Sequence, residues 1–185
     1  MGSQYSVFGN NQKDVTYINY ELNKRSHEEF GSKREKMEEI GMDRRRVFII
    51  HGQNEAKWRE LQSVLLRLGV EAIELSEQQL NGKTIIEKFE YVANQCQFAI
   101  AVFTYDDVIR KGGQEYLQVR PNVIFELGWF YARLGREKVM IVEEKNEEGN
   151  IFSDLSGIYR YRFHENVSEL YGEISDILKK AGIRP

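Results

Sequence analysis

The sequence has very little cysteine and histidine. It contains one cysteine, Cys96, and three histidines, at positions 27, 51 and 164. One cysteine cannot form an intramolecular disulfide, and three scattered histidines do not supply the clustered ligands of a zinc site. The sequence therefore predicts a domain that is stabilised by its core, without a disulfide or a metal, and this cysteine usage favours a cytoplasmic location.

Long apolar runs and a strong excess of one charge are also lacking. No stretch approaches the ~18–20 consecutive apolar residues of a membrane span, and the first residues lack the charged-then-apolar order of a signal peptide. The 26 basic and 29 acidic residues give a net charge of −3, so we expect neither a nucleic-acid nor a membrane surface. A chain of 185 residues, 41% of them apolar, is long enough for one domain with a full core.

Composition divides the chain near residue 43. Residues 1–43 are rich in Gln, Asn, Ser, Lys and Glu and poor in large apolar residues. We interpret them as a polar N-terminal extension, either peripheral or acting as an arm that binds a partner or promotes oligomerisation. Residues 44–185 alternate short apolar runs with amphipathic segments, which is typical of strands and helices that follow one another in a folded domain.

The apolar runs predict five strands joined by helices. Two of them, 47–50 and 98–103, are continuously apolar, as expected of strands that are buried on both faces. Three more are expected at 70–75, 139–142 and 158–163, the last at a sheet edge because apolar and charged residues alternate there. The long polar segment 104–121, which contains Gly112 and Gly113, is expected to be a loop.

Four helices complete the predicted domain. The first ends near Gly69, and the second is expected to bury Ile85, Ile86, Phe89 and Val92. The third runs from Pro121 to Leu134 with Asn122 as its N-cap, and the last follows a capping box of Asn166 and Glu169.

Strands that alternate with helices predict an α/β fold. Parallel neighbours need crossover connections, so we expect a flavodoxin-like, five-stranded, mainly parallel sheet with strand order 2-1-3-4-5 and helices on both faces. Ligands bind such sheets outside the carboxyl ends of the strands, at the point where strand order reverses. Three loops are predicted to converge there, at 51–55, 76–83 and 104–122.

Glu126 is a carboxylate in a helix that is otherwise nearly all apolar. Burial would raise its pKa and the positive end of the helix would lower it, and the sequence leaves the direction open. Glu126 is either a functional acid, or a solvent-facing residue, or the partner of an arginine. Its neighbours on the helix are Val123, Ile124, Phe125, Leu127, Trp129 and Phe130.

Four segments in order carry a resemblance to a known family. They are Arg46–Glu55 (RVFIIHGQNE), Asn81–Glu90 (NGKTIIEKFE), Arg120–Gly128 (RPNVIFELG) and Asp154–Gly157 (DLSG). Together they resemble the bacterial TIR-like domains, described as predicted nucleotide-binding effectors of cyclic-nucleotide-triggered antiphage systems. The resemblance covers roughly residues 44 to 182. It implies a TIR fold, cleavage of NAD between nicotinamide and ribose, and Glu126 as the catalytic acid.

This chemistry is compatible with a single carboxylate. Breaking the N-glycosidic bond of NAD develops positive charge on the ribose, which a carboxylate stabilises, and nicotinamide leaves without protonation because its ring nitrogen begins cationic. The resemblance implies NAD as the substrate, and we expect no cofactor and no metal. The predicted substrate-binding residues come from the converging loops and the third helix: Gly52, Gln53, Asn54, Lys83, Thr104, Tyr105, Asp106, Asn122 and Trp129.

Several of these assignments leave an alternative open. Gly52 permits close approach of the backbone, and the amides of Gln53 and Asn54 are placed to hold a pyrophosphate, although the sequence lacks a Gly-x-Gly-x-x-Gly fingerprint. Asp106 either orients substrate or lies in a solvated turn. Tyr105 and Trp129 either stack on a base or belong to the core.

The resemblance also implies partners. TIR active sites are typically completed by neighbouring protomers, so we expect self-association into an oligomer or filament. Many relatives carry a cyclic-nucleotide sensor in the same chain, for which this sequence has no room. The chain is either an excised or stand-alone effector, or its N-terminal extension docks to a sensor protein or cyclic-nucleotide-responsive partner. Two other functions remain open: an N-glycosidic enzyme of the nucleoside deoxyribosyltransferase type, and a non-enzymatic TIR adaptor that only self-associates.

Overall fold

The computed structural model of the chain describes residues 46–78, 82, 84–146, 149–150, 155 and 157–183. All of these residues belong to one compact unit, Arg44–Pro185. The polar extension predicted at residues 1–43 lies outside the described residues, as does Lys83.

The unit is built on a five-stranded sheet in which all neighbours are parallel. Its strands are β1 (Arg46–His51), β2 (Glu71–Ile73), β3 (Phe98–Phe103), β6 (Val139–Glu144) and β8 (Tyr161–Phe163), in the order β2-β1-β3-β6-β8. This is the predicted flavodoxin-like order. Strands β2 and β8 are shorter than predicted, and β8 forms the expected edge of the sheet.

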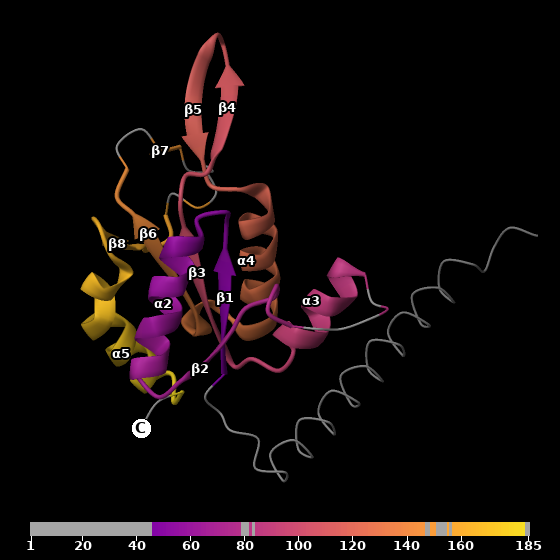
Figure 1. The fold of residues 1–185 in the computed structure, drawn as a ribbon, viewed down its shortest axis with the longest axis vertical. Helices are drawn as coiled ribbons and strands as arrows, with labels where there is room; N and C mark the ends of the chain where they lie inside the picture. Colours follow the sequence, from indigo (N-terminus) through magenta and orange to yellow (C-terminus); the bar gives the residue numbers. More distant parts are fainter. Residues whose placement is uncertain are drawn as a thin grey trace, which may run out of the picture. The chain divides into compact units, whose positions relative to one another are not determined.

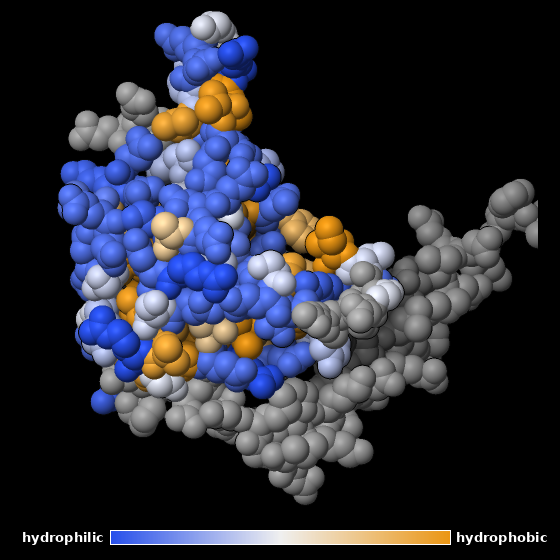
Figure 2. Space-filling model, in the orientation of Figure 1, coloured by the Kyte–Doolittle hydropathy of each residue, from blue (hydrophilic) through white to orange (hydrophobic). Residues whose placement is uncertain are grey.

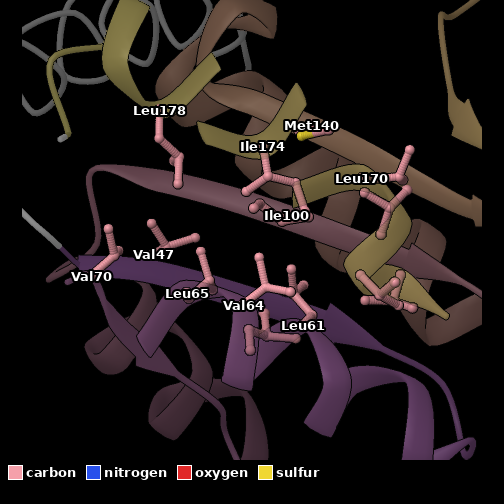
Figure 3. Packing of buried hydrophobic residues seen from close by; sticks show 14 of the residues in the cluster. Val47, Leu61, Val64, Leu65, Val70, Ile100, Met140, Leu170, Ile174 and Leu178 are labelled. Carbon is pink, nitrogen blue, oxygen red and sulfur yellow. The ribbon is translucent and has the colours of Figure 1, made fainter. Parts of the chain in front are cut away.

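Helices cover both faces of the sheet (Figure 1). On one side lie α2 (Glu55–Arg67), the 3-10 turn η3 (Val167–Leu170) and α5 (Tyr171–Lys180); on the other lie α3 (Ile85–Ala93) and α4 (Pro121–Leu134), which leads into the 3-10 turn η1 (Arg136–Lys138). Figure 3 shows Leu61, Val64 and Leu65 of α2 facing Ile174 and Leu178 of α5 across the hydrophobic core on the first of these two sides.

The sheet has a hydrophobic core on each face, and the side chains of the central strands contribute to both. Successive side chains of a strand point to opposite faces, so Val47 and Ile49 of β1 pack under α2 while Phe48 and Ile50 pack under α3 and α4. All six residues of β3 are buried, in agreement with the continuous apolar run in the sequence. No helix in the described part of the chain is long and apolar enough to cross a membrane.

Two predictions about helices were wrong. The helix that contains Glu126 starts at Pro121, with Arg120 rather than Asn122 as its N-cap, because proline fits the first helical position, where its missing N–H is not needed. Helix α3 buries Phe89, but Ile85 and Ile86 at its start are 78% and 51% exposed, because only its later turns pack against the sheet. The capping box of Asn166 and Glu169 is confirmed, at the start of η3.

The segment predicted as a long polar loop is mostly a β-hairpin, a further correction. Strands β4 (Asp107–Lys111) and β5 (Gln114–Gln118) pair antiparallel, and the short β7 (Gly149–Asn150) joins β5. The two-residue turn is Gly112–Gly113, with φ of 61° and 82°, values that glycine adopts without strain. The hairpin projects beyond the carboxyl ends of the sheet strands (Figure 1).

Candidate active site

A pocket of about 270 Å³ opens at the carboxyl ends of β1 and β2. It lies beside the point where strand order reverses between β1 and β3, which is where a sheet of this topology is expected to hold a ligand. Its walls come from the ends of these two strands and from α3 and α4: Ile49, His51, Glu74, Leu75, Ser76, Ile85, Lys88 and Glu126.

Glu126 contributes a partly buried carboxylate to this pocket from the second turn of α4. Burial raises the pKa of the Glu126 carboxyl to about 7; the charge of His51 lowers it and the carboxylate of Glu74 raises it further. Among the described residues, none donates a hydrogen bond to the Glu126 side chain and no arginine pairs with it. Its oxygens are therefore available to a ligand, which favours the functional acid over the two alternatives.

His51 and Glu74 form a close pair beside Glu126. His51 is the last residue of β1, Glu74 follows β2 directly, and the His51 Nε2 lies 2.9 Å from a carboxylate oxygen of Glu74. Burial lowers the pKa of His51, but hydrogen bonds with Glu74 and Gly52 and the neighbouring carboxylates raise it more. Burial raises the pKa of Glu74, but the hydrogen bonds that it accepts lower it to about 2.

Four of the predicted substrate-binding residues are joined by hydrogen bonds, and a fifth lies against them. A carboxylate oxygen of Asp106 accepts hydrogen bonds from the amide of Gln53 at 2.7 Å, from the amide of Asn54 at 3.4 Å and from the hydroxyl of Thr104 at 2.9 Å. A Cβ on Gly52 would lie 2.2 Å from the same oxygen. In this structure Asp106 therefore occupies the two amides, and Gly52 makes room for its carboxylate. That the amides hold a pyrophosphate stays a prediction, and it requires Asp106 to move.

Tyr105 points into a second polar cluster. Its hydroxyl donates to Glu143 at 2.6 Å, and Glu143 also accepts from Arg160 at 3.0 Å and from Arg162 at 2.8 Å. Glu143 is 1% exposed, so three donors compensate a carboxylate that is almost completely buried. The cluster ties the segment after β3 to β6 and β8, a structural role that accounts for Tyr105.

Asn122 and Trp129, the other predicted residues in the described part of the chain, do not line the pocket. Asn122 is exposed in the first turn of α4. Trp129 packs against Phe89 and Phe130, each with a centroid distance of 5.1 Å, which is the core position that the sequence left open. The described residues contain no group of three or more His, Cys, Asp or Glu side chains that could hold a metal ion.

Residues 46–165, more than half of the chain, match the family described as "CAP12/Pycsar effector protein, TIR domain". The chain belongs to this family. It is 39% identical to the protein YuaY of Escherichia coli K12 over 116 residues, which are 62% of this chain and 38% of YuaY. It is also 32% identical to protein tirC of Dictyostelium discoideum over 143 residues, 72% of this chain and 71% of tirC. The chain thus spans well under half the length of YuaY.

A solved structure supports the same fold. The TIR domain of the Toll-related receptor TRR-2 from Hydra magnipapillata superposes with a TM-score of 0.53 at 10% identity, covering 74% of this chain and 97% of that domain. At this identity the likeness concerns the fold alone. The strand order of the present chain and its match to the family model agree with the resemblance drawn from the four sequence segments.

Sequence reasoning missed Glu74 in this TIR domain. It treated the residue as part of strand 70–75, whereas β2 ends at Ile73 and the Glu74 carboxylate turns into the loop. Its position was the available signal: a charged residue that ends an apolar strand beside the reversal of strand order lies where ligands bind. Lys88 was missed for another reason, because a lysine in an amphipathic helix is usually solvated.

Proposed function

We propose that this TIR domain cleaves the bond between nicotinamide and ribose in NAD and so acts as a cytoplasmic effector of antiphage defence. One observation carries the proposal: the Glu126 carboxylate, whose pKa is raised to about 7, lines a pocket at the carboxyl ends of the strands, and no hydrogen-bond donor among the described residues engages its oxygens. The chain belongs to a family of TIR effectors, and this membership supports the proposed role as an effector.

The proposed role of Glu126 is electrostatic or nucleophilic. As the C–N bond breaks, its electron pair moves to the nicotinamide nitrogen, which becomes neutral, and the ribose carbon becomes cationic. An ionised carboxylate beside the ribose stabilises that cation or bonds to it transiently. Water then adds to the same carbon and loses a proton, which gives ADP-ribose, whereas attack by another group of the nucleotide would give a cyclic product.

The size of the pocket supports activation by assembly. Its volume of about 270 Å³ lies just below the range of roughly 300–1,000 Å³ for small-molecule sites. A dinucleotide must therefore extend beyond it, toward other parts of this chain or a second copy. We propose that self-association, triggered by a sensor protein or a cyclic-nucleotide-responsive partner, completes the site.

The test is nicotinamide release. Concentrated protein is incubated with NAD, with and without a crowding agent, and products are separated by chromatography while light scattering follows assembly. The wild type should release nicotinamide and Glu126→Gln should not, although it folds and assembles equally. Glu137→Gln, which changes an exposed acid in η1, is the matched control and should keep the wild-type rate.

The same experiment separates the other two functions. Preferential release of a base from a 2′-deoxyribonucleoside instead of NAD would indicate a deoxyribosyltransferase-type enzyme. Assembly without cleavage of either substrate, and an unchanged biological effect of Glu126→Gln, would indicate an adaptor.

A further inference from the structure

His51 presents both ring nitrogens to oxygen atoms that accept hydrogen bonds. Its Nδ1 lies 2.8 Å from the carbonyl oxygen of Gly52, and its Nε2 lies 2.9 Å from a carboxylate oxygen of Glu74. A neutral imidazole has one N–H and satisfies only one of these acceptors, whereas an imidazolium has two. Both contacts are hydrogen bonds only if the ring is cationic or if Glu74 holds the proton.

The surroundings of Glu74 keep the proton off its carboxylate. Besides the His51 ring, Glu74 accepts hydrogen bonds from the amide and the hydroxyl of Ser76 and from the amide of Glu77. Four donors around one buried carboxylate stabilise its ionised form. The proton therefore resides on His51, and Glu74, with its oxygens engaged, is not available to a substrate hydroxyl.

The orientation of the His51 ring is fixed from a third side. The ring stacks on Trp58 of α2, with centroids 4.9 Å apart and planes at 27°. The guanidinium of Arg59 lies 4.0 Å from the centre of the Trp58 ring, and Arg59 also pairs with Glu77 in the loop after β2. Turning the imidazole toward a ligand would break two hydrogen bonds and this stacking, so His51 is poorly placed to exchange protons with a substrate.

We propose that His51 is a positioning residue: a lasting imidazolium, held by Glu74, whose positive charge on the wall of the same pocket favours the ionised form of the Glu126 carboxylate. The proposal rests on the role assigned to Glu126 above. Lys88 of α3 lines the pocket, while Asp106, after β3, is turned toward the amides of Gln53 and Asn54. His51, at the end of β1, thus supplies a positive charge whose position is fixed by two hydrogen bonds and by stacking. The long side chain of a lysine would not fix its charge in this way.

The charge of His51 is tested on the unmodified protein. In the full chain labelled with ¹⁵N-histidine, the ring of His51 should show two protonated nitrogens at pH 7.5, about one pH unit above the ordinary pKa of histidine. A ring with one protonated nitrogen at that pH would overturn the proposal. Glu74→Gln should lower the pH at which this ring loses its proton; an unchanged midpoint in the folded variant would also contradict it.

The effect on Glu126 is tested with His51→Gln, which keeps a hydrogen-bond donor but removes the charge. The titration midpoint of the Glu126 carboxyl carbon, followed by ¹³C NMR, should move to higher pH. If the midpoint rises by about one pH unit from about 7, nicotinamide release should fall roughly tenfold at pH 6 and less than about twofold at pH 8.5. His164→Gln, at an exposed histidine that pairs with Glu169, is the matched control and should leave both profiles unchanged.

These outcomes separate the two proposals. An unmoved Glu126 midpoint in folded His51→Gln, or an equal loss of activity at every pH, would show that His51 is merely structural. If the wild type releases no nicotinamide while the Glu126 midpoint still moves, the proposed function fails and the electrostatic coupling stands. If His51→Gln does not fold, the measurements on the wild type and on Glu74→Gln decide.

Discussion

Gly52→Ala provides a sharp test of the contact between the loops after β1 and β3. The new Cβ would lie 2.2 Å from a carboxylate oxygen of Asp106, so that carboxylate must move. The same oxygen accepts two short hydrogen bonds, from the Gln53 amide at 2.7 Å and the Thr104 hydroxyl at 2.9 Å. A hydrogen bond to a charged group contributes about 1.5–3 kcal/mol, so losing both should lower the free energy of unfolding by about 3–6 kcal/mol.

The assay is urea denaturation followed by circular dichroism, arranged as a double-mutant cycle. Asp106→Ala alone should cost about as much as Gly52→Ala, and adding Gly52→Ala to it should cost less than about 1 kcal/mol, because the clashing oxygen is gone. Gly128→Ala is the matched control. It adds a methyl group in α4 where no atom lies within 4 Å, and should stabilise the fold by about 0.5–1 kcal/mol. An equal cost of Gly52→Ala in both backgrounds would refute the reasoning.

Three other predictions concern titratable groups. The pKa of Glu126 is about 7 in the fold against an ordinary value of 4.5, so its ionisation destabilises the fold as pH rises. Glu126→Gln should therefore raise the free energy of unfolding, measured by urea denaturation, by about 3 kcal/mol at pH 8 and by little at pH 4. Glu143→Leu leaves Arg160 without its buried partner and should cost about 3–5 kcal/mol in thermal denaturation, whereas a cost below about 1 kcal/mol would contradict the proposed role of the cluster. Burial raises the pKa of the Cys96 thiol to about 12, so it should react with a thiol reagent far more slowly in native protein than in urea.

The sheet could be predicted from the sequence because its central strands are continuous apolar runs. Segments 47–50 and 98–103 leave no polar side to face water, which requires helices on both faces. The β4–β5 hairpin was missed although Gly112–Gly113 is a typical two-residue turn, because the flanking residues are mostly polar and do not alternate clearly. Ile85 and Ile86 were predicted to be buried because an apolar stripe does not show where a helix leaves the sheet it covers.

The site could be predicted only in part. Glu126 was recognisable as a candidate because a carboxylate among apolar neighbours is exceptional, and the structure places it on the wall of the pocket. The contact of Asp106 with Gln53 joins residues 53 positions apart, and the pairing of His51 with Glu74 joins residues 23 apart. Neither separation follows from helical or strand periodicity, so these partners required the three-dimensional arrangement. Proximity in the fold also separated Trp129, a core residue, from the pocket.

The central claim is that the Glu126 carboxylate carries out the chemistry. The most direct measurement is the initial rate of nicotinamide release at saturating NAD and pH 8, for wild type and Glu126→Gln at equal concentration and equal light scattering. If the carboxylate stabilises the ribosyl cation, the variant should lose at least about 10²-fold in kcat. Release by folded, assembled Glu126→Gln at a rate within about twofold of the wild type would contradict the account.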